Sequence, residues 1–499
     1  MIDQKRIRRR TFMKHSAVLG MASAFGLDGD KTLGLTEGAT EKKEQKRPNL
    51  LFVFPDQMRR HAMGFMKQDP VITPVLDRFS DDSIVFTHAT STHPLCSPYR
   101  GSLFTGLYPH RSGLPTNCHS SRRNVYLRRE TTTLTDILAR GGYDVGYIGK
   151  WHLKTPDEGH GYHGPWIPPE DRHSTDFWYI WSDKHRNNFQ PSYWKNDAQP
   201  DELIVPGRVW SAIHETNVAV DYLYNKNKAF RDENKPFALF VSWNPPHDPY
   251  TKAEVPKEYY DQYGDAVSKE LLNRDNVVDS KKTEGATRHA RGYFASVTGI
   301  DDQFGRILQA LKSTGLEEDT LVVFTSDHGE MLGSHGLMTK NQCYEESFGI
   351  PLLMRWKGRL LPRRDDLLIG TPDLMPTLLA LLGLGDKIPA GIHGKDLSAA
   401  VQNEKQAHRP EIAWYFNASN NARGLRTHKM SCFFDRKKDA TTDLLFNLND
   451  DPYQMHNLAK ARPDLLKEFG AQTYEWLKNI GDDFSDYQKK GAYLNTIPV

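Results

Sequence analysis

Apolar runs of strand length recur along the chain, and stretches with a helical spacing of apolar residues lie between them. Four runs are apolar almost throughout, which is typical of strands whose two faces are both buried. They cover residues 49–54, 143–148, 237–243 and 321–326. Helical patterns cover 133–140 and 293–311. The alternation predicts an α/β fold with a large, mostly parallel sheet sandwiched by helices.

The pattern changes near residue 405, where the β-like stretches become shorter. They cover 411–416 and 429–434, and an amphipathic helical pattern covers 463–480. We therefore expect a main α/β domain over residues 48–404. A smaller C-terminal α+β subdomain, built from an antiparallel sheet and a helix, should cover 405–499.

Residues 160–235 form a distinct stretch of the main domain, dense in Trp, Tyr, His and Asn. This composition indicates an aromatic-rich insertion that lines the mouth of a site. Aromatic rings of this kind suit stacking on sugar rings, but an ordinary aromatic-rich surface subdomain would have the same composition. The sequence does not choose between these two interpretations.

Polar residues with the chemistry of ligands, acids or bases stand just past the end of each predicted strand. In open α/β sheets the carboxyl ends of the strands form the edge where ligands bind, so these residues should converge on one crevice. The four clusters are Asp56-Gln57, Lys150 with His152, Asn244 with His247, and Asp327-His328. A single cluster could simply begin a loop, but four together favour a site.

The net charge of the chain argues against some classes of binding partner. The chain has 499 residues, with 65 Lys and Arg against 63 Asp and Glu, so its formal net charge is +2. This balance provides no overall field that would favour nucleic acid. No segment approaches the ~18 consecutive apolar residues that a helix needs to span a bilayer, so we expect no stable membrane span. A preference for an anion must come from a local site.

The four cysteines give little sign of a structural role. Cys96, Cys118, Cys343 and Cys432 lie far apart and show no C-x-x-C spacing. A zinc cluster or a disulfide scaffold is therefore not expected, although one disulfide among them stays open.

The first residues have the order of an export signal. Arg9, Arg10, Phe12 and Lys14 follow the order RR-x-F-x-K, and a short apolar run over 17–27 contains small residues suited to cleavage. This is typical of a twin-arginine signal, and residues 1–47 are interpreted as that signal and a linker. We expect a protein exported by the twin-arginine machinery to the periplasm or secreted.

Cys96, Pro98 and Arg100 fall into the spacing C-x-P-x-R. Together with the polar clusters above, this motif resembles the type I, formylglycine-dependent sulfatases of the alkaline phosphatase superfamily. The resemblance runs from about residue 47 to residue 458, in the family's order of motifs. It implies an alkaline phosphatase-like fold and a sulfuric ester hydrolase.

The resemblance also implies roles for individual residues. A maturation enzyme would oxidise Cys96 to 3-oxoalanine (formylglycine), whose hydrate is the nucleophile, and Arg100 would hold it. His152 and His247 would be the catalytic base and acid, although the two roles could be exchanged. The sulfate would be bound by Lys150, Lys340 and Asn244. The metal site would consist of Asp56, Gln57, Asp327, His328 and the modified Cys96.

Those roles agree with elementary chemistry. Sulfate ester cleavage needs a cation on the sulfuryl oxygens and an acid for the leaving alkoxide. Carboxylate and amide oxygens are the ligands that Ca²⁺ prefers, whereas His328 leaves Mn²⁺ or another divalent ion open. Tyr99 stands where the family commonly has serine, and Gln57 where it commonly has a second aspartate.

Three functions remain to be separated. The first is removal of sulfate from a sulfated carbohydrate, either a polysaccharide or a glycosaminoglycan fragment. The second is a phosphodiesterase or phosphonate monoester hydrolase of the same superfamily. The third is a non-catalytic protein that binds sulfated glycans, because fold alone does not guarantee activity.

Overall fold

The computed structural model describes residues 47–155, 165–182, 188–264, 271–278, 284–437 and 440–482. The export signal expected at residues 1–47 lies almost entirely outside the described residues. Parts of the aromatic-rich stretch, 160–164 and 183–187, lie outside them as well.

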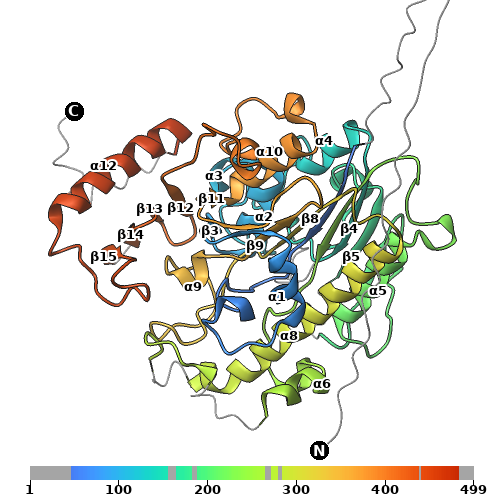
Figure 1. The fold of residues 1–499 in the computed structure, drawn as a ribbon, viewed down its shortest axis with the longest axis horizontal. Helices are drawn as coiled ribbons and strands as arrows, with labels where there is room; N and C mark the ends of the chain where they lie inside the picture. Colours follow the sequence, from blue (N-terminus) through green and yellow to red (C-terminus); the bar gives the residue numbers. More distant parts are fainter. Residues whose placement is uncertain are drawn as a thin grey trace, which may run out of the picture. The chain divides into compact units, whose positions relative to one another are not determined.

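A large mixed sheet is the centre of the described chain (Figure 1). Its nine strands have the order β10-β2-β9-β8-β1-β7-β4-β5-β6. The five strands from β8 to β5 are parallel to one another, whereas β9 and β6 run antiparallel to their neighbours. The bounds are β1 Asn49–Val53, β2 Ile84–Phe86, β4 Asp144–Gly149, β5 Phe177–Trp181, β6 Tyr193–Lys195, β7 Phe237–Ser242, β8 Thr320–Thr325, β9 Leu352–Arg355 and β10 Arg363–Asp365. The predicted α/β fold with a mostly parallel sheet is confirmed.

The four apolar runs form the four central strands, each within one residue or so of its predicted bounds. Successive side chains of a strand point to opposite faces, and each face has its own apolar core. Leu50, Phe52 and Phe54 belong to one core, and Leu51 and Val53 to the other. Both faces of β1 are buried, which explains why its sequence is apolar without alternation.

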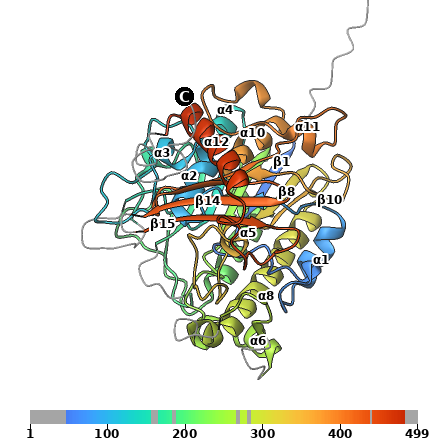
Figure 2. The ribbon, with the colours of Figure 1, turned by 90° about the vertical axis from the view of Figure 1, so that its left-hand side faces the viewer.

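Helices cover both faces of the sheet, as Figures 1 and 2 show. One core includes residues of α2, α4 and α10, and the other includes residues of α1, α5 and α8. The bounds are α1 Pro74–Asp81, α2 Cys96–Thr105, α3 Pro109–Ser112, α4 Leu134–Arg140, α5 Ser211–Leu223, α6 Lys257–Tyr260, α8 Glu284–Ser313, α9 Glu345–Phe348, α10 Thr371–Leu381, α11 Ser398–Val401 and α12 Pro463–Ile480.

The helix predicted over 293–311 begins nine residues earlier, in a polar stretch that ends at Gly292. A Cβ on Gly292 would lie 1.8 Å from the carbonyl oxygen of Tyr250, so this close approach requires glycine.

The described part of the aromatic-rich stretch contributes β5, β6 and α5 to the large sheet and its cover. Most of its rings are buried, including those of Trp178, Tyr193, Trp210 and Tyr222. Burial in the core therefore accounts for much of the aromatic density.

The C-terminal region forms the predicted antiparallel sheet, with α12 packed on it (Figure 2). Its strands, in order, are β12 Ala413–Asn417, β13 Ala422–Arg426, β14 Met430–Lys437 and β15 Ala440–Asn447. A short parallel pair, β3 Ala89–Thr90 and β11 Ile369–Gly370, forms a separate two-stranded sheet. The sequence pattern did not predict β13, whose Arg423 and Arg426 are buried by tertiary ion pairs with Asp482 and Glu345.

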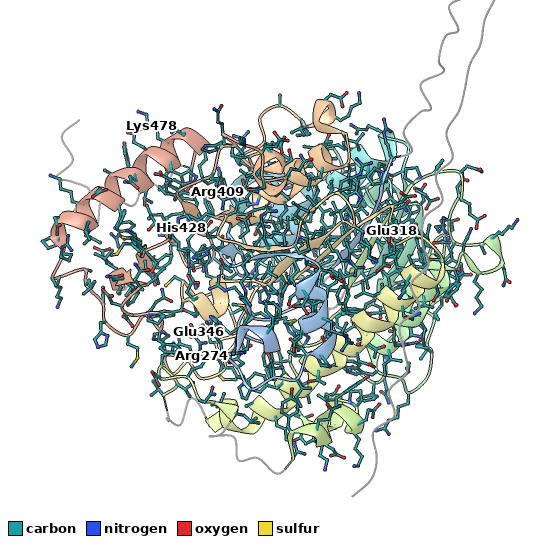
Figure 3. All side chains as sticks on the ribbon, in the orientation of Figure 1. Arg274, Glu318, Glu346, Arg409, His428 and Lys478 are labelled. Atoms are coloured by element: carbon teal, nitrogen blue, oxygen red, sulfur yellow. The ribbon has the colours of Figure 1, made fainter. Side chains whose placement is uncertain are left out.

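Buried ion pairs connect this small sheet to the main domain. Glu345 of α9 accepts from Arg426 of β13 at 2.8 Å and from Arg60 at 2.5 Å. The neighbouring Glu346 pairs with Arg274 at 2.7 Å, and Figure 3 labels both residues. Loss of Arg426 or Glu345 would leave an uncompensated buried charge, so their pair helps to fix how the two parts meet, whereas the Glu346–Arg274 pair lies within the main domain.

The sequence led us to expect no membrane span and left open one disulfide among the four cysteines. Within the described ranges, no helix has both the length and the apolar character needed to cross a bilayer. All four cysteines are free, so the disulfide left open by the sequence is absent.

Candidate active site

The predicted convergence at one sheet edge is confirmed. Strands β8, β1, β7 and β4 are adjacent and parallel, so the loops after them meet at the same edge. A cavity of about 430 Å³ opens there. Its lining residues are Cys96, Asn117, Lys150, His152, Trp181, Asn244, His247, Asp248, Pro249 and Lys340.

Cys96 lies at the floor of this cavity, at the start of α2. Leu95 is the N-cap, and Pro98 occupies the first turn, where its missing N–H costs no hydrogen bond. The N–H of Ser97 donates to Oδ1 of Asn117 at 2.9 Å. The positive end of a ten-residue helix therefore lies beneath the cysteine and favours a bound anion.

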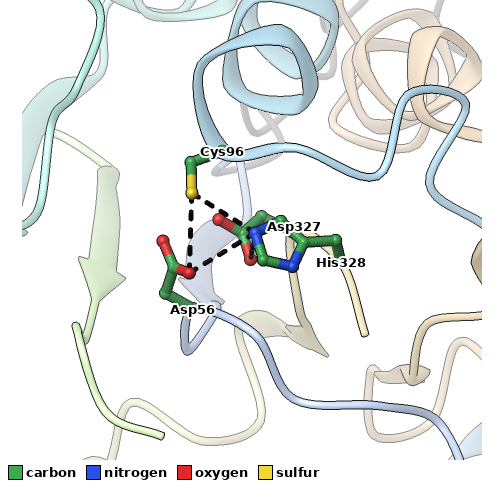
Figure 4. Close-up of side chains that lie close together, drawn as sticks. All are labelled: Asp56, Cys96, Asp327 and His328. Carbon is green, nitrogen blue, oxygen red and sulfur yellow. Dashed lines mark hydrogen bonds and ion pairs between the residues drawn. The ribbon is translucent and has the colours of Figure 1, made fainter. Parts of the chain in front are cut away.

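Four buried side chains form one cluster, with the Cys96 sulfur among them (Figure 4). They are Asp56, Cys96, Asp327 and His328, and one ligand atom of each lies within 4.8 Å of the others. The sulfur is 3.3 Å from Nε2 of His328 and 3.7 Å from Oδ1 of Asp56. Oxygen and nitrogen donors that converge in this way can hold a divalent metal ion.

The two carboxylates of this cluster influence each other. Burial and the charge of Asp56 raise the pKa of Asp327 to about 6. Burial also opposes ionisation of Asp56, but Lys150, His247 and His328 outweigh it and hold the pKa of Asp56 well below its usual value. The cluster therefore resists a second negative charge unless a cation compensates it.

Arg100 joins the strand ends beneath the cavity. Its Nη2 is 3.2 Å from Oδ2 of Asp56 and 3.2 Å from Oδ2 of Asp327. Its Nη1 donates to the carbonyl oxygen of Lys150 and to Oγ of Ser242, each at 2.7 Å. The fully buried guanidinium thus sets the positions of both carboxylates and of the loop after β4.

Lys150 is the cation on the β4 side of the cavity. Its Nζ lies 2.8 Å from Oδ2 of Asp56 and donates to Oδ1 of Asn244 at 3.2 Å. Burial opposes the charge of Lys150, but Asp56 outweighs that effect and raises the pKa of the lysine. Lys150 is therefore an ammonium group that lines the cavity at neutral pH.

Lys340, on the loop after β8, is the second cation. Its Nζ donates to Nε2 of His247 at 2.6 Å and to the side-chain oxygen of Gln57. The Gln57 amide also donates to Tyr250 Oη at 2.5 Å and to Glu330. The Gln57 side chain thus holds Lys340, while its backbone N–H donates to Oδ1 of Asp327 at 2.9 Å.

The two histidines assigned from sequence both line the cavity but have different surroundings. His152 is half-buried, but both of its ring nitrogens are buried, and neither has a hydrogen-bond partner among the described residues. Burial lowers its pKa, which keeps the ring neutral and able to accept a proton. Nδ1 of His247 is 2.9 Å from the carbonyl oxygen of Asp248, so Nδ1 donates there while Nε2 accepts from Lys340.

Three further residues belong to the site and had no role from sequence. Asn117 and Trp181 line the cavity; Asn117 lies in a stretch with no recognisable pattern, whereas Trp181 belongs to the aromatic-rich stretch expected to line the mouth of a site. Asp248 directly follows His247, and its Oδ1 lies 3.1 Å from the histidine's Nδ1. Its place next to a candidate acid was a usable signal, and the aromatic density of residues 160–235 pointed to the region of Trp181, whereas the position of Asn117 depends on the tertiary fold.

The comparison with known proteins agrees with this geometry. Residues 48–384 match the family model described as Sulfatase. The chain belongs to the sulfatase family. This sulfatase is therefore a sulfuric ester hydrolase of the alkaline phosphatase superfamily. Residues 333–475 also match a model described as N-sulphoglucosamine sulphohydrolase, C-terminal.

Several relatives are similar to this sulfatase over nearly their whole length. An endo-4-O-sulfatase of Bacteroides thetaiotaomicron is 38% identical over 91% of this chain and 97% of its own. An ulvan-active sulfatase of Formosa agariphila is 31% identical over 91% of this chain and 86% of its own. A solved structure from work on glycosaminoglycan metabolism by Bacteroides thetaiotaomicron has a TM-score of 0.83 and 35% identity, and the match covers 91% of this chain and 100% of that one.

The family implies a formylglycine and a divalent metal ion, and the described residues fit both groups. Cys96 has the required position next to Arg100, in the C-x-P-x-R spacing. Asp56, Asp327 and His328 offer donors to a cation beside it, and the raised pKa of Asp327 indicates that its negative charge is only partly compensated without one.

Proposed function

We propose that this sulfatase removes sulfate from a sulfated carbohydrate, with a formylglycine formed from Cys96 and a bound Ca²⁺ ion. The observation that carries the proposal is the position of Cys96. It lies on the floor of an open cavity, next to a buried metal-binding group and between two lysines and two histidines. A binding protein would have no need for a modifiable nucleophile at that point.

The side chains around Cys96 suit the binding of a sulfate group. Lys150 and Lys340 provide positive charge on opposite sides of the cavity, and Asn244 lies beside Lys150. The α2 N-terminus adds a fixed positive end below them. These groups would orient the sulfuryl oxygens and leave the sulfur facing residue 96.

We assign the two proton transfers of the reaction to different histidines. The ring nitrogens of His152 are buried and have no hydrogen-bond partner in the described chain, and burial keeps the ring neutral, which suits a base that accepts a proton from the group at residue 96. His247 lines the same cavity, and its Nε2 accepts from the ammonium of Lys340, so a proton from Lys340 could pass through His247 to the departing sugar oxygen.

A bound divalent ion would supply positive charge to the sulfuryl oxygens and to the group at residue 96. Asp56, Asp327 and His328 would hold it, and Gln57 would contribute if its amide oxygen turned from Lys340 toward the cluster. We propose Ca²⁺ because two carboxylates dominate the donor set, with Mn²⁺ as the alternative that His328 favours.

Several observations support a carbohydrate substrate. Curated relatives include the endo-4-O-sulfatase and the ulvan-active sulfatase above, and an N-acetylglucosamine-6-O-sulfatase that is 24% identical over 90% of this chain. Trp181 adds an aromatic ring to the cavity wall, and Asp248 adds a carboxylate that can accept from sugar hydroxyls. We further propose that residues 1–47 direct export by the twin-arginine machinery to the periplasm or beyond, where such polymers are met.

The proposal is tested by sulfate release from a panel of sulfated saccharides, using protein made with and without a formylglycine-generating enzyme. Mass spectrometry of the peptide that contains Cys96 should show the aldehyde in the first preparation only, and turnover should require it. The variant Cys96→Ala is the matched control. Faster turnover of phosphate diesters than of any sulfate ester would instead support a phosphodiesterase.

A further inference from the structure

Asn341 lies where three parts of the molecule meet. It directly follows Lys340, and its N–H donates at 2.9 Å to the carbonyl oxygen of Pro94, two residues before Cys96. Its Oδ1 is 3.2 Å from Nε2 of His93. The loop that carries Lys340 is thus attached through Asn341 to the segment that carries the nucleophile.

The third part is the turn between β12 and β13 of the C-terminal sheet. Asn417, the last residue of β12, is fully buried, and its Nδ2 donates to Oδ1 of Asn341 at 2.8 Å. Asn420 of the same turn donates to the carbonyl oxygen of Asn341 at 2.9 Å. Both acceptors of Asn341 are therefore occupied by donors from the C-terminal sheet.

Asn417 also organises the turn that it belongs to. Its Oδ1 accepts from Oγ of Ser419 at 2.9 Å and from the N–H of Asn420 at 3.0 Å. The amide thus has two functions on its two ends: the oxygen holds the turn together, and the nitrogen holds Asn341. Replacing the nitrogen by an oxygen would remove the second function while keeping the acceptor for the first.

The Lys340 loop needs such external support because its backbone is unfavourable by itself. Thr339 and Asn341 have φ values of 64° and 70°, in the left-handed region. Asparagine tolerates that region, but the β-branched threonine does so only when its surroundings fix it. Lys340, between these residues, reaches into the cavity and contacts His247. Its ammonium group is therefore placed by contacts outside its own loop.

We propose that Asn417 is a positioning residue, which acts through Asn341 to set the ammonium of Lys340 beside His247 and residue 96. The C-terminal sheet thereby controls how strongly the catalytic cavity binds the sulfate group. This inference rests on the proposed function, because it takes Lys340 as a sulfate-binding cation. It extends that function by making the β12–β13 turn part of the anion site.

The test compares Asn417→Asp with Asn421→Asp, two identical changes in the same turn. Asn421 contacts Arg436 and not Asn341, so its variant is the control for the added charge and for the stability of the turn. We expect N417D to weaken inhibition by inorganic sulfate and to lower kcat/KM on the order of tenfold, and N421D to change each by less than about twofold. Thermal unfolding should show both variants folded.

A double-mutant cycle with Lys340→Ala separates positioning from a general structural role. In the K340A background, N417D should have almost no further effect on sulfate inhibition, because the group it positions is gone. Equal losses in both backgrounds, or equal behaviour of N417D and N421D, would overturn the inference. If the parent protein turns over no sulfate ester but calorimetry shows that N417D weakens the binding of inorganic sulfate, the proposed function fails and the positioning of Lys340 stands.

Discussion

Single residues in this site carry more than one interaction, and their geometry assigns them different chemical tasks. Arg100 contacts both Asp56 and Asp327 and also the carbonyl oxygen of Lys150. Lys340 contacts both His247 and Gln57. Because each cation contacts several partners, a change at one residue should alter a specific step, such as a proton transfer or the binding of the metal ion.

The first prediction separates His247 from His152. Replacing His247 by alanine should slow hydrolysis of a sulfated sugar by roughly 10²–10⁴-fold, since an alkoxide leaves only when it is protonated. Hydrolysis of nitrophenyl sulfate should slow far less, because a nitrophenolate leaves without a proton. Turnover numbers of both substrates provide the measurement. His152→Ala should slow both substrates alike, and the reverse pattern would exchange the two roles.

The second prediction concerns the metal ion. Chelation should lower the melting temperature of the protein, because a cation that binds only the folded state stabilises it by mass action. Asp327→Asn removes one of two mutually repelling buried carboxylates, so the metal-free variant should melt higher than the metal-free parent and should not respond to Ca²⁺. Melting curves with EDTA and with Ca²⁺ test this. The exposed variant Glu233→Gln should respond like the parent, and a Ca²⁺ response in D327N would argue against the site.

At the scale of elements, the strands position the catalytic residues, and the N-terminus of a helix adds positive charge beside them. The loops after β1, β4, β7 and β8 supply most of the site, while α2 supplies Cys96 at its positive end. Helix ends elsewhere are stabilised in other ways. Both carboxylate oxygens of Asp301, in α8, accept from backbone N–H groups at the start of α1, at 2.9 and 2.7 Å.

Asp301 provides a prediction about pH and stability. Burial raises its pKa to about 7, well above the value near 4 expected in the unfolded chain. The folded protein therefore binds this proton more tightly, and the stabilisation from Asp301 is complete below pH 4 and is lost as the pH rises toward 7. The slope can reach about 1.4 kcal/mol per pH unit. Denaturant unfolding across that range should show a smaller loss in Asp301→Asn than in the parent protein, and identical slopes would contradict the prediction.

At the scale of the whole molecule, the two sheets behave as parts of one structure. Trp476 of α12 stacks on Trp414 of β12 with ring centres 4.5 Å apart, and its edge meets Tyr108 of the main domain at 5.1 Å. The ion pairs of Glu345 add a second connection. The C-terminal sheet is therefore joined to the main domain by both aromatic packing and a buried ion pair.

Trp476→Ala tests this joint packing. Removal of the buried ring should cost about 3–5 kcal/mol and lower the stability of the whole described fold in a single transition. Tyr474, on the exposed side of α12, is the control, and Tyr474→Ala should have little effect. Denaturant curves followed by fluorescence and by loss of activity should coincide. Separate transitions for the two signals would show that the sheets unfold independently.

The sequence by itself was enough to predict the strands that are buried on both faces and the polar residues that follow them. The four central strands are apolar on both faces because helices cover both, so their periodicity was readable. Polar residues at their carboxyl ends must converge when the strands are parallel and adjacent. The C-x-P-x-R motif and these ends were therefore enough to predict Cys96, Arg100, His152 and His247 as neighbours of one cavity.

Only the tertiary structure decided the features that depend on partners distant in sequence. Strand β13 contains two arginines, and it forms a buried strand only because Asp482 and Glu345 neutralise them. Gln57 was predicted as a metal ligand, and its amide lies among Lys340, Tyr250 and Glu330, from the loops after β8 and β7. The hydrogen bond from Asn417 to Asn341, which supports the Lys340 loop, joins two residues that are 76 apart in sequence, so it leaves no local sequence pattern. Apolar burial is recorded in the spacing of neighbouring residues, whereas the pairing of buried polar groups is set by which distant segments the fold brings together.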